Sequence, residues 1–144
     1  RLQAAYDGWH VVDLQDAIAS ADVVATATGG KKVVNSLALD SAKDGVFILN
    51  VGHVAEEIDC EHLRQFPHEE VMPYINAYRL PEKTIYLMAD GSMLNLTAGF
   101  GDSLNAFDVT LAVMASGIRH IVTDGMQAEA DVYLLPQSVW QQAL

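Results

Sequence analysis

The chain has 144 residues, 51% of them hydrophobic, and a formal net charge of -11. This is enough apolar material for one domain with a buried core, so we expect a single domain over residues 1–144. The acidic excess argues against nucleic acids and membranes as partners, because their phosphate groups would repel the chain. The single cysteine, Cys60, excludes an internal disulfide, and with no apolar run of membrane-spanning length we predict a cytoplasmic protein.

The N-terminal part predicts a helix end, a strand and a second helix. Residues 1–6 are typical of a helix already under way, and the chain does not begin with Met, so we expect a fragment of a longer protein. Residues 9–12 predict a short strand. Residues 14–20 predict a helix that Asp13 caps and that carries its apolar side chains on one face.

Two apolar, β-branched runs predict strands buried on both faces. Residues 21–28 end in Gly29-Gly30, and residues 46–51 end in Gly52-His53. A helix over residues 35–42 separates them. Strands that alternate with helices predict a parallel sheet covered by helices, so the fold class is α/β.

The second half of the chain is less regular at first and then strongly helical. A short helix is predicted over residues 56–65, followed by extended segments over 71–79 and 84–88 that are joined across residues 80–83. Residues 90–92 form a predicted turn.

The C-terminal part predicts the best helix of the chain. It starts at Asp102 or Ser103 and runs to His120, because apolar side chains recur at helical spacing. A strand over residues 132–135 and a last helix that begins with Pro136 and ends at Leu144 complete the chain.

The ends of the two buried strands are candidate ligand contacts. In open α/β sheets, ligands bind beyond the carboxyl ends of the strands. Thr26, Thr28 and Gly29 lie at one such end, and Gly52 and His53 lie at the other. The alternative interpretation is that the glycines only form the turns that any strand needs. Neither a Gly-x4-Gly-Lys-Ser/Thr loop nor a Gly-x-Gly-x-x-Gly motif occurs in the sequence.

A metal site is a weaker interpretation. The spacing of the potential ligands matches no standard zinc pattern, so we predict no metal. These residues are Glu56, Glu57, Asp59, Cys60, His62 and His68.

Several motifs together are more specific than any one of them. In chain order they are Asp22-Val-Val-Ala-Thr-Ala-Thr-Gly29, Asn50-Val-Gly-His53, Glu57-Ile-Asp59, Met88-Ala-Asp-Gly91 and Leu94-Asn-Leu96. Their order and spacing resemble the NAD-binding domain of S-adenosylhomocysteine hydrolases. The similarity extends over nearly the whole chain, up to Val132-Tyr-Leu-Leu-Pro136.

The resemblance implies a fold, a cofactor and a reaction. The fold is an incomplete Rossmann-like, doubly wound and mostly parallel sheet flanked by helices, without the first βαβ unit, its glycine-rich loop and the substrate domain. The cofactor is NAD, which oxidises the 3′-hydroxyl of a nucleoside substrate so that homocysteine leaves by elimination and water adds. The small-molecule substrate is a nucleoside thioether, and the expected assembly is a homo-oligomer.

The resemblance also implies roles for individual residues. His53 is the candidate catalytic residue, as a ribose-hydroxyl contact or a proton relay. Asn95 is expected to hold the nicotinamide carboxamide. The alternatives are that His53 satisfies a strand-end carbonyl and that Asn95 caps a turn. The other expected cofactor contacts are Thr26, Thr28, Gly29, Val51 and Gly52.

One departure from the family keeps other functions open. Gly101-Asp102-Ser103 stands where the family has Gly-His-Pro, so an acidic residue replaces an imidazole. A non-catalytic, regulatory relative is therefore one alternative, and a 2-hydroxyacid-type dehydrogenase with similar strand ends is another. Because the upstream strands are not in this sequence, the strand at Val23 is expected to have an open edge that favours self-association.

Overall fold

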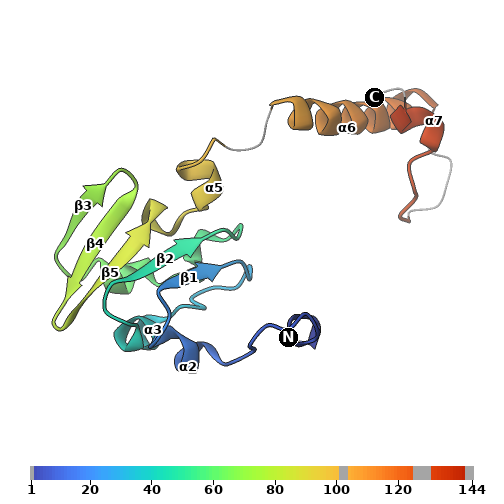
Figure 1. Cartoon of the computed structure of the whole chain (residues 1–144). Helices are drawn as coiled ribbons and strands as arrows, with labels where there is room; N and C mark the ends of the chain where they lie inside the picture. Colours follow the sequence, from blue (N-terminus) through green and yellow to red (C-terminus); the bar gives the residue numbers. More distant parts are fainter. Residues whose placement is uncertain (1, 101–103, 125–130, 142–144) are drawn as a thin grey trace. The chain divides into compact units, whose positions relative to one another are not determined.

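The computed structural model describes residues 2–100, 104–124 and 131–141. They form two compact units, which divide between Gly99 and Phe100 and are described separately (Figure 1). The prediction of one domain over the whole chain stays a prediction.

The first unit contains a five-stranded sheet with the order β1-β2-β5-β4-β3. Strands β1, β2 and β5 run parallel, and the β3–β4 and β4–β5 pairs are antiparallel. The predicted α/β class, with an incomplete Rossmann-like sheet, is confirmed. The strands are β1 (Val23–Thr26), β2 (Val46–Asn50), β3 (His68–Met72), β4 (Ile75–Leu80) and β5 (Lys83–Met88).

The helices near the N-terminus follow the predicted order. They are α1 (Leu2–Tyr6), α2 (Leu14–Ile18) and α3 (Ser36–Ser41). Asn35 caps α3, because its side-chain oxygen accepts a hydrogen bond from Ala38 N at 3.0 Å. The core joins α2 and α3 to the sheet, whereas α1 buries no residue. The fully buried core members include Ile18, Leu39, Val46, Ile48, Ile85 and Leu87.

The predicted helix over residues 56–65 is wrong as one element. The structure has a 3-10 turn η1 (Ala55–Glu57) and then α4 (Cys60–Leu63). Ile58 separates them because its backbone is extended and forms a parallel bridge with Val34. A strand-like bridge and a continuous helix exclude each other at the same residue.

The segment over residues 71–79 is also not a single strand. A tight turn at Pro73-Tyr74 divides it into β3 and β4, and Tyr74 has a φ of 65°. Beyond the sheet, η2 (Ala89–Gly91) occupies the predicted turn, and a short helix α5 (Leu94–Thr97) follows that the sequence did not predict.

Two predicted strands are not strands in the structure. Residues 9–12 and 132–135 have no ladder partner. Trp9 is 73% exposed, and Val132 and Leu134 are 95% and 97% exposed. Apolar alternation gives a strand only when a neighbouring strand supplies the hydrogen bonds.

The second unit contains α6 (Leu104–Asp124) and α7 (Gln137–Trp140). The long predicted helix is confirmed, although its predicted first residues, Asp102 and Ser103, lie outside the described residues. Pro136 stands at the N-cap of α7. Within the described ranges, no helix has the length and apolar character needed to cross a bilayer.

Candidate functional site

The carboxyl ends of the parallel strands bring the predicted site residues into neighbouring positions. Thr26 at the end of β1 is in register with Asn50 at the end of β2, and Asn50 forms a parallel bridge with Met93. Two residues beyond these three positions lie Thr28, Gly52 and Asn95. The carboxyl ends of β1, β2 and β5 lie at the same edge of the sheet (Figure 1). Thr28 and Gly52 both contact Glu57 there, and Asn95 lines a groove with Val51.

Asn50 is the centre of this edge. Its side chain is fully buried and all four of its hydrogen bonds are internal. Its oxygen accepts from Gly52 N at 2.7 Å and from the Thr26 hydroxyl at 3.2 Å. Its nitrogen donates to Val54 O at 2.9 Å and to Gly91 O at 3.1 Å. One amide therefore ties together the ends of β1, β2 and β5.

Thr26 lies at the site, but its hydroxyl is already used. It donates to Asn50, and the Thr26 carbonyl accepts from Val51 N at 2.9 Å and Gly52 N at 3.1 Å. The side chain is only 4% exposed. Its predicted contact with a cofactor stays a prediction, and its observed contacts hold the two strand ends together.

Thr28 and Gly29 surround a buried carboxylate. Glu57 accepts from Thr28 N at 2.9 Å, from the Thr28 hydroxyl at 2.7 Å and from Gly29 N at 2.9 Å. These bonds lower the pKa of Glu57, with the Thr28 backbone amide as the largest cause and burial opposing them. The carboxylate is therefore ionised at neutral pH.

Gly52 is a position where no side chain has room. A Cβ at this position would overlap Glu57 Oε1 and would lie 3.1 Å from Ala27 Cα. The β1 and β2 turns approach each other closely here, and glycine permits that approach.

Val51 and Asn95 line one groove beside this edge. Its volume is about 440 Å³, and most of its lining is apolar. The Asn95 side chain is exposed and hydrogen-bonds to none of the residues that the structure describes. The remaining lining residues are Pro73, Tyr74, Ile75, Met88, Leu94, Ala98 and Gly99.

The chemistry of this groove fits a nicotinamide ring. The ring is flat and weakly polar, and it carries one carboxamide that needs both a donor and an acceptor. An apolar groove with one uncommitted amide offers both properties. The same edge does not fit a pyrophosphate, because the Thr28 and Gly29 amides already bind Glu57.

His53 follows Gly52 at the end of β2. Its side chain is exposed, and within the described part of the chain it forms no hydrogen bond or ion pair. The imidazole is therefore available to a ligand at this edge, which agrees with the predicted catalytic role without testing it.

The potential metal ligands are dispersed. Cys60 is buried, His62 lies 2.9 Å from Asp40, and Glu57 binds backbone amides. Among the described residues, no group of three or more His, Cys, Asp or Glu side chains is placed to hold a metal. The expectation of no metal stays a prediction.

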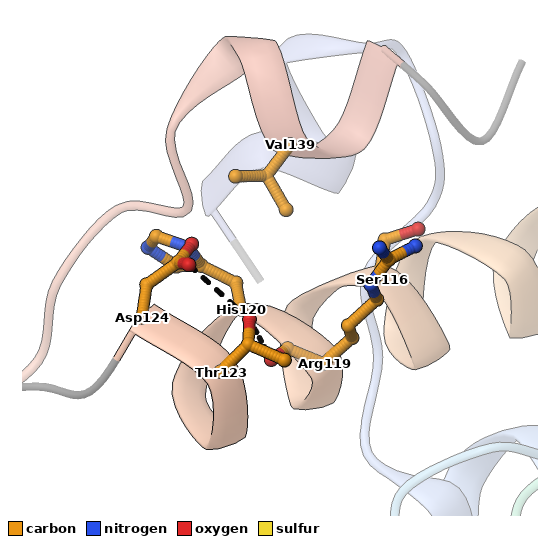
Figure 2. A pocket seen from close by; sticks show the side chains of 6 residues that line it. All are labelled: Ser116, Arg119, His120, Thr123, Asp124 and Val139. Atoms are coloured by element: carbon orange, nitrogen blue, oxygen red, sulfur yellow. Dashed lines mark hydrogen bonds and ion pairs between the residues drawn. The ribbon is translucent and has the colours of Figure 1, made fainter.

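A separate small cavity lies in the second unit, between α6 and α7 (Figure 2). Its volume is about 170 Å³, and Val139 of α7 faces the polar end of α6. His120 Nδ1 lies 2.6 Å from Asp124 Oδ2, and this hydrogen bond is the largest cause that lowers the pKa of Asp124. These polar groups pair within one helix, so they stabilise its C-terminal turn.

Sequence reasoning missed the roles of Asn50 and Glu57. Together with Thr26 they are the buried polar or charged residues of the described chain apart from Tyr78, and all three meet at the site. The signal for Asn50 was available, because an amide that ends an apolar strand needs partners. Glu57 was named only within the Glu57-Ile-Asp59 motif and as a potential metal ligand, and its burial gave no signal, because its donors lie 28 and 29 positions earlier in the chain.

Comparison with known proteins shows the family of the chain. A family model described as "S-adenosyl-L-homocysteine hydrolase, NAD binding domain" matches residues 1–101. The chain is similar to the S-inosyl-L-homocysteine hydrolase of Methanopyrus kandleri, with 32% identity over 142 residues. It is also similar to adenosylhomocysteinases of Archaeoglobus fulgidus and Saccharolobus solfataricus, each with 31% identity.

The alignments cover unequal shares of the two partners. Each covers 96% of this chain but only 34% or 35% of these relatives. The chain therefore spans about a third of the length of the curated relatives it matches.

Proposed function

The chain belongs to the S-adenosylhomocysteine hydrolase family, with NAD as the cofactor of its matched domain, and on this premise we propose that the protein containing it hydrolyses an S-nucleosyl-homocysteine. The resemblance predicted from the motifs is confirmed. A 2-hydroxyacid-type dehydrogenase is not favoured, because the similar relatives named above are hydrolases.

The arrangement at the carboxyl edge of β1 and β2 carries the proposal: Thr28 and Gly52 both contact Glu57, and Asn95 shares a groove with Val51. NAD, when bound, accepts a hydride from the carbon that bears the ribose 3′-hydroxyl. Asn95 holds and orients the carboxamide, and Val51 forms part of the apolar wall against the ring. Gly52 lets the ring and the ribose approach the backbone closely.

His53 is proposed to move the proton of the ribose hydroxyl. An imidazole can both accept and donate a proton near neutral pH, so it can serve the forward and the return step. Its exposure and its freedom from partners among the described residues support this role.

The nucleoside base is proposed to be selected outside this chain. One relative is named for an inosyl substrate and the others for an adenosyl substrate, yet their identities to this chain are 32% and 31%. The segment they share with this chain does not separate the two names. The substrate class is therefore a nucleoside thioether of homocysteine.

Location and assembly complete the proposal. Cys60 is buried and unpaired, which favours a reducing compartment such as the cytoplasm. Among the strands that the structure describes, β1 pairs with β2 alone, and an open strand edge favours association, here into a homo-oligomer. Neither nucleic acid nor a membrane is expected as a partner, because of the net charge of -11.

The direct test uses the full-length protein from which this chain comes. We expect it to purify with NAD and to convert S-adenosylhomocysteine or S-inosylhomocysteine to the nucleoside and homocysteine. NAD retention without turnover of either substrate would favour the non-catalytic relative. Turnover of a 2-keto acid would favour the dehydrogenase. The 144-residue chain alone is expected to bind NAD weakly, because it contains no Gly-x-Gly-x-x-Gly loop.

Two variants separate cofactor binding from proton transfer. Asn95→Ala should weaken NAD binding by about tenfold, the effect of losing one to two net hydrogen bonds. Asn76→Ala, an amide that does not line the groove, is the matched control. His53→Ala should lower turnover by roughly 100-fold or more and leave NAD affinity nearly unchanged. His68→Ala, on β3, is the control for that variant.

A further inference from the structure

We propose that Glu57 is the positioning residue of the cofactor site, an internal anion that fills the amide turn at Thr28-Gly29 and fixes its shape. The proposal concerns the same site as the proposed function. It rests on that function only in the experiment that measures NAD binding. Glu57 lies on η1, outside the strand-end motifs, and none of the roles described above uses it.

The first step of the argument is the contact set. The carboxylate is fully buried, and both of its oxygens accept hydrogen bonds from one turn. Oε2 accepts from Thr28 N at 2.9 Å and from the Thr28 hydroxyl at 2.7 Å, and Oε1 accepts from Gly29 N at 2.9 Å and from Thr28 N at 3.2 Å. Successive amides that converge on one acceptor form an anion site, so this site is already occupied from within the chain.

The second step is that Glu57 also touches the other turn. Its Oε1 fills the space that a Cβ on Gly52 would need. The carboxylate therefore lies between the β1 turn, which it binds by hydrogen bonds, and the β2 turn, which it contacts sterically. A shift of Glu57 would change both walls of the site beside His53.

The third step concerns charge. No lysine, arginine or histidine in the described ranges forms an ion pair with Glu57. Neutral donors therefore lower its pKa: the Thr28 amide is the largest cause, and the Thr28 hydroxyl, the Gly29 amide and the Thr26 hydroxyl add to it. A glutamine of the same shape would place an NH2 group against one of these donors, so the turn needs both carboxylate oxygens as acceptors.

The first experiment tests the anion site on the 144-residue chain without NAD. In Glu57→Ala, added formate should bind the vacated turn and move the Thr28 and Gly29 amide resonances in a saturable way. Wild type and Glu56→Ala, the exposed neighbour, should give no such movement. A folded Glu57→Ala whose Thr28 and Gly29 amides ignore formate would overturn the proposal.

A second variant protects the test against misfolding. Glu57→Gln keeps the volume, and we expect the Thr28 and Gly29 amides to exchange with solvent at least about tenfold faster than in wild type. Glu56→Gln should leave them unchanged. Equal exchange in wild type and Glu57→Gln would overturn the proposal as well.

The third experiment uses the full-length protein with NAD. Glu57→Ala should bind NAD at least about tenfold more weakly, and formate, but not chloride, should restore most of the affinity. A folded Glu57→Ala or Glu57→Gln with wild-type NAD affinity would show that Glu57 only supports the fold and would overturn the positioning role. If wild type binds no NAD, the proposed function fails while the formate result on the shorter chain still stands.

Discussion

The parallel and antiparallel halves of the sheet differ in where their polar side chains lie. At the carboxyl edge of β1 and β2, the polar residues Thr26, Asn50 and Glu57 are all buried. The Thr26 hydroxyl donates to Asn50, and the Thr28 hydroxyl, two residues further along the chain, donates to Glu57. On the hairpin of β3 and β4, the polar contacts are exposed, as in the Arg79–Glu69 ion pair, whose side chains are 53% and 61% exposed.

The difference indicates which half carries the function. Burying a polar side chain lowers the stability of the fold unless its hydrogen bonds are all satisfied. Buried polar side chains are therefore expected where they fix the shape of a site. An exposed ion pair adds little to stability and little to shape. The buried edge should therefore respond strongly to small changes in its polar side chains, and the hairpin should respond weakly.

Asn50→Ala is expected to have the largest effect. It removes the four hydrogen bonds that the buried side chain makes with the Thr26 hydroxyl, Gly52 N, Val54 O and Gly91 O. We expect the free energy of unfolding to fall by about 3 kcal/mol, measured by urea denaturation.

Asn76→Ala on β4 is the matched control for the hairpin half. The Asn76 side chain donates one exposed hydrogen bond of ordinary length, 2.8 Å, to Asp90 Oδ1. Its loss should cost less than about 1 kcal/mol. Equal losses for Asn50→Ala and Asn76→Ala would contradict the distinction between the two halves.

Gly52→Ala is expected to have the next largest effect. The new methyl group would overlap the Glu57 carboxylate and press on the Ala27 backbone. The free energy of unfolding should fall by roughly 1–3 kcal/mol.

Gly117→Ala is a control with the opposite expected effect. Gly117 lies within α6, and a Cβ there would meet Leu135 Cδ2 at an ordinary contact distance of 3.5 Å. The substitution should therefore stabilise that helix by up to about 1 kcal/mol. A loss at Gly117 as large as that at Gly52 would remove the steric explanation.

The buried parallel strands could be predicted from the sequence, whereas the partners of other segments could not. β1 and β2 are β-branched runs that end at glycine, and both were found. Residues 9–12 have the same local character but no neighbouring strand, and composition does not reveal a missing neighbour. The turn at Tyr74 could not be predicted, because tyrosine rarely adopts a φ of 65°.

The candidate site could be predicted only in part: the residues at the strand ends could be named from the sequence, but the burial of Glu57 could not. Strand ends are visible in a sequence, so Thr28, Gly52 and His53 could be named, and their convergence follows from parallel register. Whether a glutamate is buried depends on donors far away in the chain. Glu57 therefore had the appearance of a surface residue of a short helix until the structure brought Thr28 and Gly29 to it.

The pH dependence of stability offers a smaller, graded test of the buried edge. The pKa of Glu57 is lower in the folded protein than its ordinary value of 4.5, so the folded state binds the proton less well than the unfolded state. This contribution is present above about pH 4.5 and is lost as the pH falls through the lower, folded pKa. Wild type should exceed Glu57→Gln in stability near neutral pH, and the gap should shrink below about pH 4.5 in urea denaturation. A gap that stays constant down to about pH 3 would mean that charge is not the cause.

Arg79→Ala is expected to have the smallest effect, although its contact is among the shortest. Arg79 Nη2 lies 2.6 Å from Glu69 Oε1 on the hairpin, but water screens both groups and ordering two long side chains costs entropy. We expect a loss of less than about 0.5 kcal/mol that shrinks further in high salt, measured by thermal denaturation at two salt concentrations. The Glu69→Gln variant should give the same small loss, because either change removes the pair. A loss near that of Asn50→Ala would mean that the hairpin also depends on its polar contacts, and that burial is not what separates the two halves of the sheet.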